Sequence, residues 1–190
     1  DLHSTSRRQR QMCIRDRKLP AFTLENPQLW SCEFPQLYNA EVVVTADGMV
    51  VDSLTEQFGI RSLEFSPEFG FKLNGKKIFL QGNANHHDLG ALGAASYDRA
   101  IERMMLQLKS FGYNCIRCSH NPYSESFARI ADRVGMLVVN ELTDKWSDND
   151  YWGGRQPFTH LWHKLITEWI KRDRNRPSII LWSLGNELQI

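Results

Sequence analysis

The chain has 190 residues and a formal net charge of +1 at pH 7. This length is enough for one or two domains with a sizeable buried core. Because the charge is nearly balanced and no apolar run reaches the length of a transmembrane helix, we expect neither nucleic acid nor a membrane as a partner.

Residues 1–17 contain five arginines and no regular apolar period. The segment Met12–Arg17 is similar to a short peptide produced when sequencing adapters are translated. We therefore predict that residues 1–17 are a non-native or disordered tail and exclude them from the fold.

Residues 18–69 have the pattern of β-structure. A β-branched run, Glu41–Thr45, ends at Asp47-Gly48, a pair that favours a tight hairpin turn, and a second run covers 50–58. Residues 60–65 then alternate between apolar and polar, as a half-exposed antiparallel strand does. About fifty residues is short for a complete β-sandwich, so we expect only its C-terminal strands.

The pattern changes from residue 70 onward. After a predicted hairpin at 71–77, apolar runs at 78–82, 114–118, 136–139 and 179–184 alternate with segments of helical periodicity. The inward faces of these helices are predicted to carry Ile101, Met104, Met105, Leu108 and Phe111, then Phe127, Ile130, Ala131 and Val134, then Leu161, Leu165, Ile166, Trp169 and Ile170.

This alternation predicts an α/β fold with a parallel sheet and right-handed crossovers. No glycine-rich phosphate loop follows the first strand, which disfavours a nucleotide-binding fold. A (β/α)₈ TIM barrel needs roughly 250 residues, so residues 70–190 would supply only its N-terminal half, the first four βα units. The run at 179–184 is the strand we expect to be covered on both faces.

Cys115 and Cys118 have CxxC spacing, which is found in zinc and redox sites. In a strand, however, residues three apart point to opposite faces, and no second pair completes a tetrahedral site. We interpret both as core residues.

Each predicted parallel strand ends in polar residues, and the carboxyl ends of such strands share one edge of the sheet. We therefore expect a polar pocket there. The four strand ends are His86 to Asp88, Arg117 to Asn121, Asn140 to Asp144, and Asn186-Glu187.

Glu187 is the candidate general acid/base for cleaving a glycosidic bond, a role that requires a raised pKa near neutral pH. Asn186 could bind the sugar hydroxyl next to the reacting carbon. Trp146 is the aromatic residue best placed to contact a sugar ring, and we expect Trp169 and Trp182 in the core. Residues 151–154 could form a rim.

His86 and His120 could also bind a metal. Adjacent His86 and His87 would point to opposite faces, so they are unsuited to chelating one ion together. Neutral hydrogen bonding to sugar hydroxyls suits imidazoles as well.

From residue 27 onward the sequence resembles glycoside hydrolase family 2, which contains β-galactosidases, β-mannosidases and β-glucuronidases. The motifs that carry this resemblance are Phe58–Arg61, Gly70–Lys76, His86–Asp88, Arg117–Pro122, Asp173–Ser178 and Trp182–Glu187. The resemblance implies an Ig-like β-sandwich at 18–69 leading into a TIM-barrel catalytic domain at 70–190.

The resemblance also implies a retaining mechanism with Glu187 as the acid/base and no cofactor. It implies a sugar contact on Asn186, substrate or structural contacts on His86, Arg117 and His120, and binding of sugar hydroxyls by Asp144. Trp146 and Asp88 complete the predicted substrate contacts. Family members with a catalytic-site magnesium carry a Glu-x-His pair that is not present in 140–146, so no metal is predicted. Asn140 stands where Asp is commoner.

The nucleophile motif of the family is not matched by Glu141 or Asp144, so we expect it beyond Ile190, in a longer parent protein. The main hypothesis is a fragment of a retaining exo-β-glycosidase acting on terminal β-D-galactosides. The alternatives are a β-glucuronidase or β-mannosidase, a non-catalytic carbohydrate-binding module, and a metal-dependent barrel hydrolase using His86 and His120. The compartment and the oligomeric state stay open.

Overall fold

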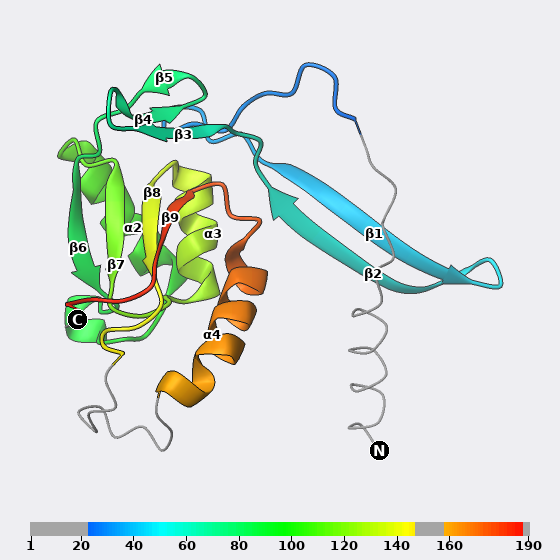
Figure 1. Ribbon diagram of the computed structural model, residues 1–190. Coiled ribbons are helices and arrows are strands. Elements are labelled where there is room, and N and C mark those ends of the chain that lie inside the picture. Colours follow the sequence, from blue (N-terminus) through cyan, green and yellow to red (C-terminus); the bar gives the residue numbers. More distant parts are fainter. Residues whose placement is uncertain (1–22, 147–157, 188–190) are drawn as a thin grey trace.

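The computed structural model describes residues 23–146 and 158–187, so the predicted tail at 1–17 lies outside the described residues. The described strands form three separate sheets (Figure 1). In chain order the elements are β1 (Tyr38–Ala46), β2 (Met49–Phe58), β3 (Leu63–Ser66), β4 (Gly70–Leu73), β5 (Lys76–Lys77), β6 (Gly82–His86), the 3₁₀ helix η1 (Gly90–Leu92), α2 (Asp98–Ser110), β7 (Cys115–Ser119), α3 (Glu125–Val134), β8 (Leu137–Glu141), α4 (Phe158–Asp173) and β9 (Ile179–Ser183).

Strands β1 and β2 form the predicted hairpin, which projects away from the rest of the molecule (Figure 1). Its turn is Asp47-Gly48, with φ of 52° and 78°. Positive φ at both central residues is what a tight type I′ turn requires. The valines at 42–44 and 50–51 are exposed in the described structure.

Strands β3, β4 and β5 form a small antiparallel sheet beyond the amino end of the parallel strands (Figure 1). The predicted turn at Asn74-Gly75 connects β4 and β5. The predicted strand at 60–65 begins only at Leu63. Before it, the side chain of Arg61 donates to the carbonyl oxygens of Pro177 and Ile179. The expected domain boundary between residues 69 and 70 falls within this sheet.

Strands β6 to β9 form one parallel sheet in sequence order, as predicted. One face packs against α2 and α3 (Figure 1), with Ile101, Met105, Phe127 and Ile130 in the core. The other face packs against Trp30, Phe71 and Leu73. Cys118 lies in the first cluster and Cys115 in the second, so the prediction that they occupy opposite faces is confirmed. Both thiols are free.

The first parallel strand is shifted from its predicted place. It was expected at 78–82, but β6 covers Gly82–His86, and Phe79 is 75% exposed. The side chain of Asn114 accounts for the shift: its Oδ1 accepts from the Gln81 N–H and its Nδ2 donates to the Phe79 carbonyl. These bonds occupy the Gln81 N–H and the Phe79 carbonyl, and regular pairing begins at Gly82 with Cys115.

Helix α3 follows its sequence signals closely. The Ser124 hydroxyl accepts from the Phe127 N–H, as an N-cap does, and Gly135 ends the helix in the left-handed conformation with φ of 72°. The apolar stripe of α2 is correct except for Phe111, which follows the last helical residue and is 79% exposed.

Helix α4 buries much less of its apolar stripe than predicted. Trp169 is buried, but Leu165 and Ile170 are exposed. In Figure 1 the helix runs obliquely from the sheet, so only its C-terminal part reaches β9. Pro157, which directly precedes this helix in the sequence, lies outside the described residues.

Strand β9 is not covered on both faces as expected. It is the last strand in the order of its sheet, and Leu181, Trp182 and Leu184 are each more than one third exposed. Trp182 packs edge to face on Trp169, with ring centroids 4.7 Å apart, but it is not a core residue. Across 23–146 and 158–187, no helix combines the length and apolarity needed to span a membrane.

A buried carboxylate joins α3 to the start of β9. Asp132 accepts hydrogen bonds from the backbone N–H and the hydroxyl of Ser178, and lies 3.4 Å from Arg176. Burial outweighs these contacts and raises the pKa of Asp132 to about 6.

Candidate active site

The register of the parallel sheet brings four strand ends to one edge. His86 of β6 pairs with Ser119 of β7, and Glu141 of β8 pairs with Ser183 of β9. Residues immediately after these pairs therefore meet at the carboxyl edge, as in other parallel β/α folds.

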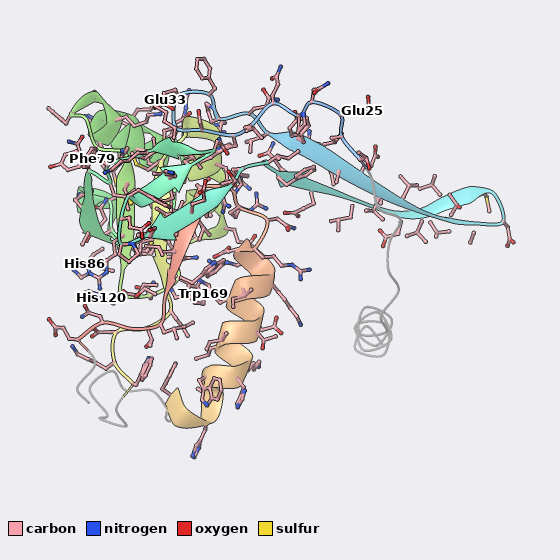
Figure 2. The ribbon with its side chains drawn as sticks, turned by 45° about the horizontal axis from the view of Figure 1, so that its top comes forward. Glu25, Glu33, Phe79, His86, His120 and Trp169 are labelled. Carbon is pink, nitrogen blue, oxygen red and sulfur yellow. The ribbon has the colours of Figure 1, made fainter. Side chains whose placement is uncertain are left out.

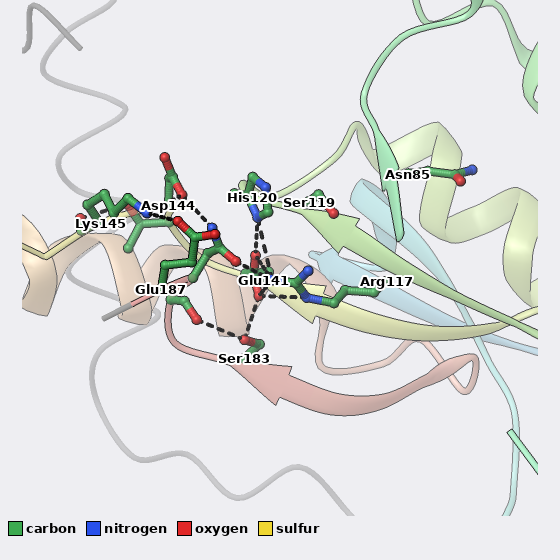
Figure 3. Close-up of polar contacts among 12 residues, drawn as sticks. Asn85, Arg117, Ser119, His120, Glu141, Asp144, Lys145, Ser183 and Glu187 are labelled. Atoms are coloured by element: carbon green, nitrogen blue, oxygen red, sulfur yellow. Dashed lines mark hydrogen bonds and ion pairs between the residues drawn. The ribbon is translucent and has the colours of Figure 1, made fainter. Parts of the chain in front are cut away.

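Glu141 lies at the centre of this edge, and its side chain is fully buried (Figure 3). Arg117 donates to both of its carboxylate oxygens at 2.9–3.1 Å. Ser183 donates to Oε2 at 2.7 Å, and His120 Nδ1 lies 2.9 Å from Oε1. One carboxylate thus connects the ends of β7, β8 and β9.

Asn186 extends this network to the loop that follows β8. Its Oδ1 accepts from Arg117 at 2.9 Å, and its Nδ2 donates to Asp144 Oδ1 at 2.9 Å. The Asn186 N–H also donates to the Asp144 carbonyl at 2.8 Å. The structure therefore brings together four of the predicted site residues: Arg117, His120, Asp144 and Asn186.

Glu187 lies at the same edge, but its side chain is 77% exposed. Lys145 donates to its Oε2 at 2.6 Å (Figure 3). This hydrogen bond and the charge of Lys145 lower the pKa of Glu187. The expected raised pKa is wrong here, because the carboxylate is exposed and bonded to an ammonium rather than desolvated.

His86 and His120 lie side by side (Figure 2), with their rings edge to face and centroids 5.2 Å apart. His87 points the other way, with Nε2 3.0 Å from the Ser96 hydroxyl and a pKa lowered by burial. The prediction that the adjacent histidines point to opposite faces is confirmed.

Asp88 stays within its own loop, where its Oδ1 accepts weakly from the Gly90 N–H at 3.5 Å. The described structure does not connect it to the Glu141 network. Among the described residues, no three histidines, cysteines or carboxylates are grouped so that they could hold a metal ion. The metal-dependent alternative thus has two imidazoles without a third ligand in this part of the chain.

Trp146 is held at the margin of the site. Its Nε1 donates to the Leu184 carbonyl at 2.9 Å, and its ring is parallel to that of Phe158, with an interplanar angle of 8°. Trp146 is 41% exposed as a residue, so part of its surface is open to a ligand. The predicted rim at 151–154 lies outside the described residues.

Asn140, the position where the resembling family more often has Asp, has a specific partner. Its Nδ2 donates to Asp173 Oδ2 at 2.9 Å in the core, and Arg172 pairs with the same carboxylate. An ionised Asp at this position would place two negative carboxylates in contact. The amide of Asn140 instead donates a hydrogen bond to Asp173, so it is well accommodated here.

Two contributors were not among the predicted site residues. Glu141 was placed at the strand ends but given no role, although its position at the end of β8, the strand next to that of Arg117, was the available signal. Lys145 has no signal in the sequence, since its partner is 42 residues away.

A parallel β/α sheet whose carboxyl edge carries joined carboxylate, amide, guanidinium and imidazole groups defines the class of β/α enzymes that act on polar ligands at the strand ends. Comparison with protein-family models shows which family within that class this chain matches. Residues 68–189 match the TIM barrel domain of glycosyl hydrolases family 2, and residues 2–61 match a second model described as glycosyl hydrolases family 2. The chain belongs to glycosyl hydrolases family 2.

Individual relatives agree with this assignment. A beta-galactosidase of Bacteroides ovatus is 40% identical over 167 residues, which is 87% of this chain and 20% of that protein. The crystal structure of a beta-glycosidase from Bacteroides vulgatus matches with a TM-score of 0.80 at 39% identity, over 87% of this chain and 22% of that one. A Parabacteroides merdae beta-glucuronidase matches with a TM-score of 0.76 at 31% identity, over 86% of this chain and 20% of that one. The chain therefore spans about a fifth of the length of these relatives.

Proposed function

We propose that this chain is part of a retaining exo-β-glycosidase that hydrolyses terminal β-D-galactosides, with Glu187 as the general acid/base. In this proposal β6 to β9 are the first four strands of an eight-stranded barrel, preceded by the C-terminal strands of an Ig-like sandwich. The observation that carries the proposal is the position of Asn186-Glu187, joined to the ends of β7 and β8 by hydrogen bonds through Arg117 and Asp144.

Asn186 is oriented for a sugar contact. Arg117 donates to its Oδ1 and Asp144 accepts from its Nδ2, so the orientation of the amide is determined by its partners. The second Nδ2 hydrogen is then available to the sugar hydroxyl next to the reacting carbon. Hydrogen bonds at that hydroxyl strengthen in an oxocarbenium-like transition state.

A retaining reaction needs a second carboxyl group about 5–5.5 Å from the first. Both oxygens of Glu141 are occupied by Arg117, His120 and Ser183, and the group is buried, so it is unsuited to attack a sugar. We infer that the nucleophile comes from outside residues 1–190 and that Glu141 positions the rim.

The charge of the rim supports a neutral sugar. Among the described residues the rim carries the carboxylates of Glu141, Asp144 and Glu187, and its cations Arg117 and Lys145 are each already paired with one of them. A uronic acid would bring a further carboxylate to cations that are already paired, whereas a galactoside would not. Because the relatives are named for β-galactosidase or β-glucuronidase activity, β-glucuronides are an alternative substrate class. β-Mannosides are an alternative from the family resemblance alone.

The test compares nitrophenyl β-galactoside, β-glucuronide and β-mannoside as substrates of the complete enzyme that contains this chain. We expect the highest kcat/KM for the galactoside. We also expect Glu187→Gln to lose about 10²- to 10⁴-fold in kcat on substrates with poor leaving groups, the usual contribution of a positioned acid. Glu64→Gln, an exposed change on β3, serves as the control.

A higher kcat/KM for the glucuronide or mannoside would contradict the substrate assignment. Full activity in Glu187→Gln would contradict the role of Glu187. Saturable sugar binding by the complete protein without turnover would favour the carbohydrate-binding module.

A further inference from the structure

The ion pair between Lys145 and Glu187 sits at the site itself. Lys145 Nζ is 2.6 Å from Glu187 Oε2 and 3.7 Å from Asp144 Oδ1, so one ammonium lies between two carboxylates (Figure 3). Glu187 has a φ of 46°, in the left-handed region that non-glycine residues rarely adopt. Non-glycine residues persist there only where their surroundings enforce it.

We propose that Lys145 is a positioning residue that holds the Glu187 carboxylate at the rim in its ionised form and so favours the step in which that carboxylate acts as a base. This proposal rests on the proposed function for its catalytic meaning. The electrostatic part of the proposal, that Lys145 keeps Glu187 ionised, concerns only these two side chains.

Lys145 is not needed to hold the two loops together. The loop after β8 and the loop after β9 are already joined by two hydrogen bonds between Asp144 and Asn186 and by the bond from Trp146 to the Leu184 carbonyl. An ion pair as exposed as Lys145–Glu187 adds little to stability. Its effect is therefore on the protonation of Glu187.

The other charged groups facing Glu187 in the described structure do not replace Lys145. His120, on the loop after β7, favours the ionised carboxylate when it is protonated, and Asp144 opposes ionisation. The hydrogen bond from Lys145 is the largest influence and lowers the pKa of Glu187. A sugar that excludes water from the rim would strengthen this attraction, because Coulombic interactions grow as the local dielectric falls.

In a double-displacement reaction the acid/base group first gives its proton to the leaving oxygen and then takes a proton from the attacking water. Lys145 disfavours the protonated Glu187 that the first step needs and favours the ionised Glu187 that the second step needs. The alkaline limb of the kcat/KM profile reports the protonated acid of the free enzyme, so Lys145 should place this limb at a lower pH than Glu187 alone would give.

The test uses Lys145→Met, which removes the charge at similar length, and Lys145→Arg, which keeps it. Lys76→Met on β5, an exposed change at the opposite end of the parallel sheet, is the matched control. The pKa of Glu187 is followed by carbon-13 NMR of glutamate-labelled chain, with Glu187→Gln identifying the resonance. The alkaline limb of kcat/KM is measured in the complete enzyme.

We expect the pKa of Glu187 to rise in Lys145→Met and to stay near the wild-type value in Lys145→Arg and Lys76→Met, with the alkaline limb moving to higher pH in Lys145→Met only. An unchanged Glu187 titration in Lys145→Met would overturn the proposal while leaving the proposed function standing. A shifted titration with an unmoved alkaline limb would support the assignment of Lys145 and contradict Glu187 as the acid.

Discussion

Replacing Glu141 with Gln tests whether this carboxylate organises the strand ends. The change keeps the size of the side chain but removes the charge and turns one acceptor oxygen into a donor. Arg117 loses its bidentate partner, and whichever oxygen becomes an amide nitrogen faces a donor from Arg117 or Ser183.

The magnitude follows from burial. Removing one partner of a buried ion pair costs roughly 3–5 kcal/mol, because the other charge is left without compensation. Glu141 is fully buried, but the side chain of Arg117 is 35% exposed and water can take over part of its solvation. We therefore expect the lower end of this range, a loss of about 3 kcal/mol in the free energy of unfolding.

The assay is equilibrium unfolding in denaturant, followed by circular dichroism, with a thermal scan on the same samples. For a chain of this size, about 3 kcal/mol corresponds to a fall in Tm of about 6–12 °C. Glu64→Gln on the exposed face of β3 should change stability by less than about 0.5 kcal/mol. A Glu141→Gln protein as stable as Glu64→Gln would refute the central role of Glu141.

Two further predictions concern buried groups. Because the pKa of Asp132 is about 6 when folded, above its ordinary value, its contribution to stability is present at low pH and lost as pH rises through 6. The stability of the wild type relative to Asp132→Asn should therefore fall by about 2 kcal/mol between pH 4 and pH 7, and a flat difference would contradict this. Burial also raises the pKa of Cys32, Cys115 and Cys118, the first two to about 11. In a Cys13→Ser background, a disulfide reagent at pH 8 should modify these thiols only after unfolding, and fast reaction of the folded chain would contradict their burial.

The order of strands and helices could be predicted because local signals agree with the tertiary structure. Ser124 and Gly135 mark the start and the end of α3 through local capping interactions. Asp47-Gly48 determines its turn through the backbone conformation of these two residues. The boundary of β6 could not be predicted, because it depends on the side chain of Asn114, more than thirty residues away, which accepts the hydrogen bond of the Gln81 N–H.

The location of the candidate site could be predicted from the sequence, but the hydrogen bonds between its residues could not. Strand ends of a parallel sheet necessarily share an edge, which brought Arg117, His120 and Asn186 together. The partner of each group depends on register and on the loop conformation after β8. Glu141 therefore acquired three partners, and Glu187 acquired Lys145, through contacts that the sequence does not encode locally.

The proposal depends most on Glu187 as the acid/base of a retaining glycosidase, and azide rescue tests this directly. In the complete enzyme, Glu187→Gly should form a glycosyl-enzyme from an activated aryl β-galactoside but hydrolyse it slowly, since no base activates water. Azide needs no base, so it should restore turnover and give the β-galactosyl azide. The absence of rescue, or an α-galactosyl azide as the product, would contradict the role of Glu187 or the retaining mechanism.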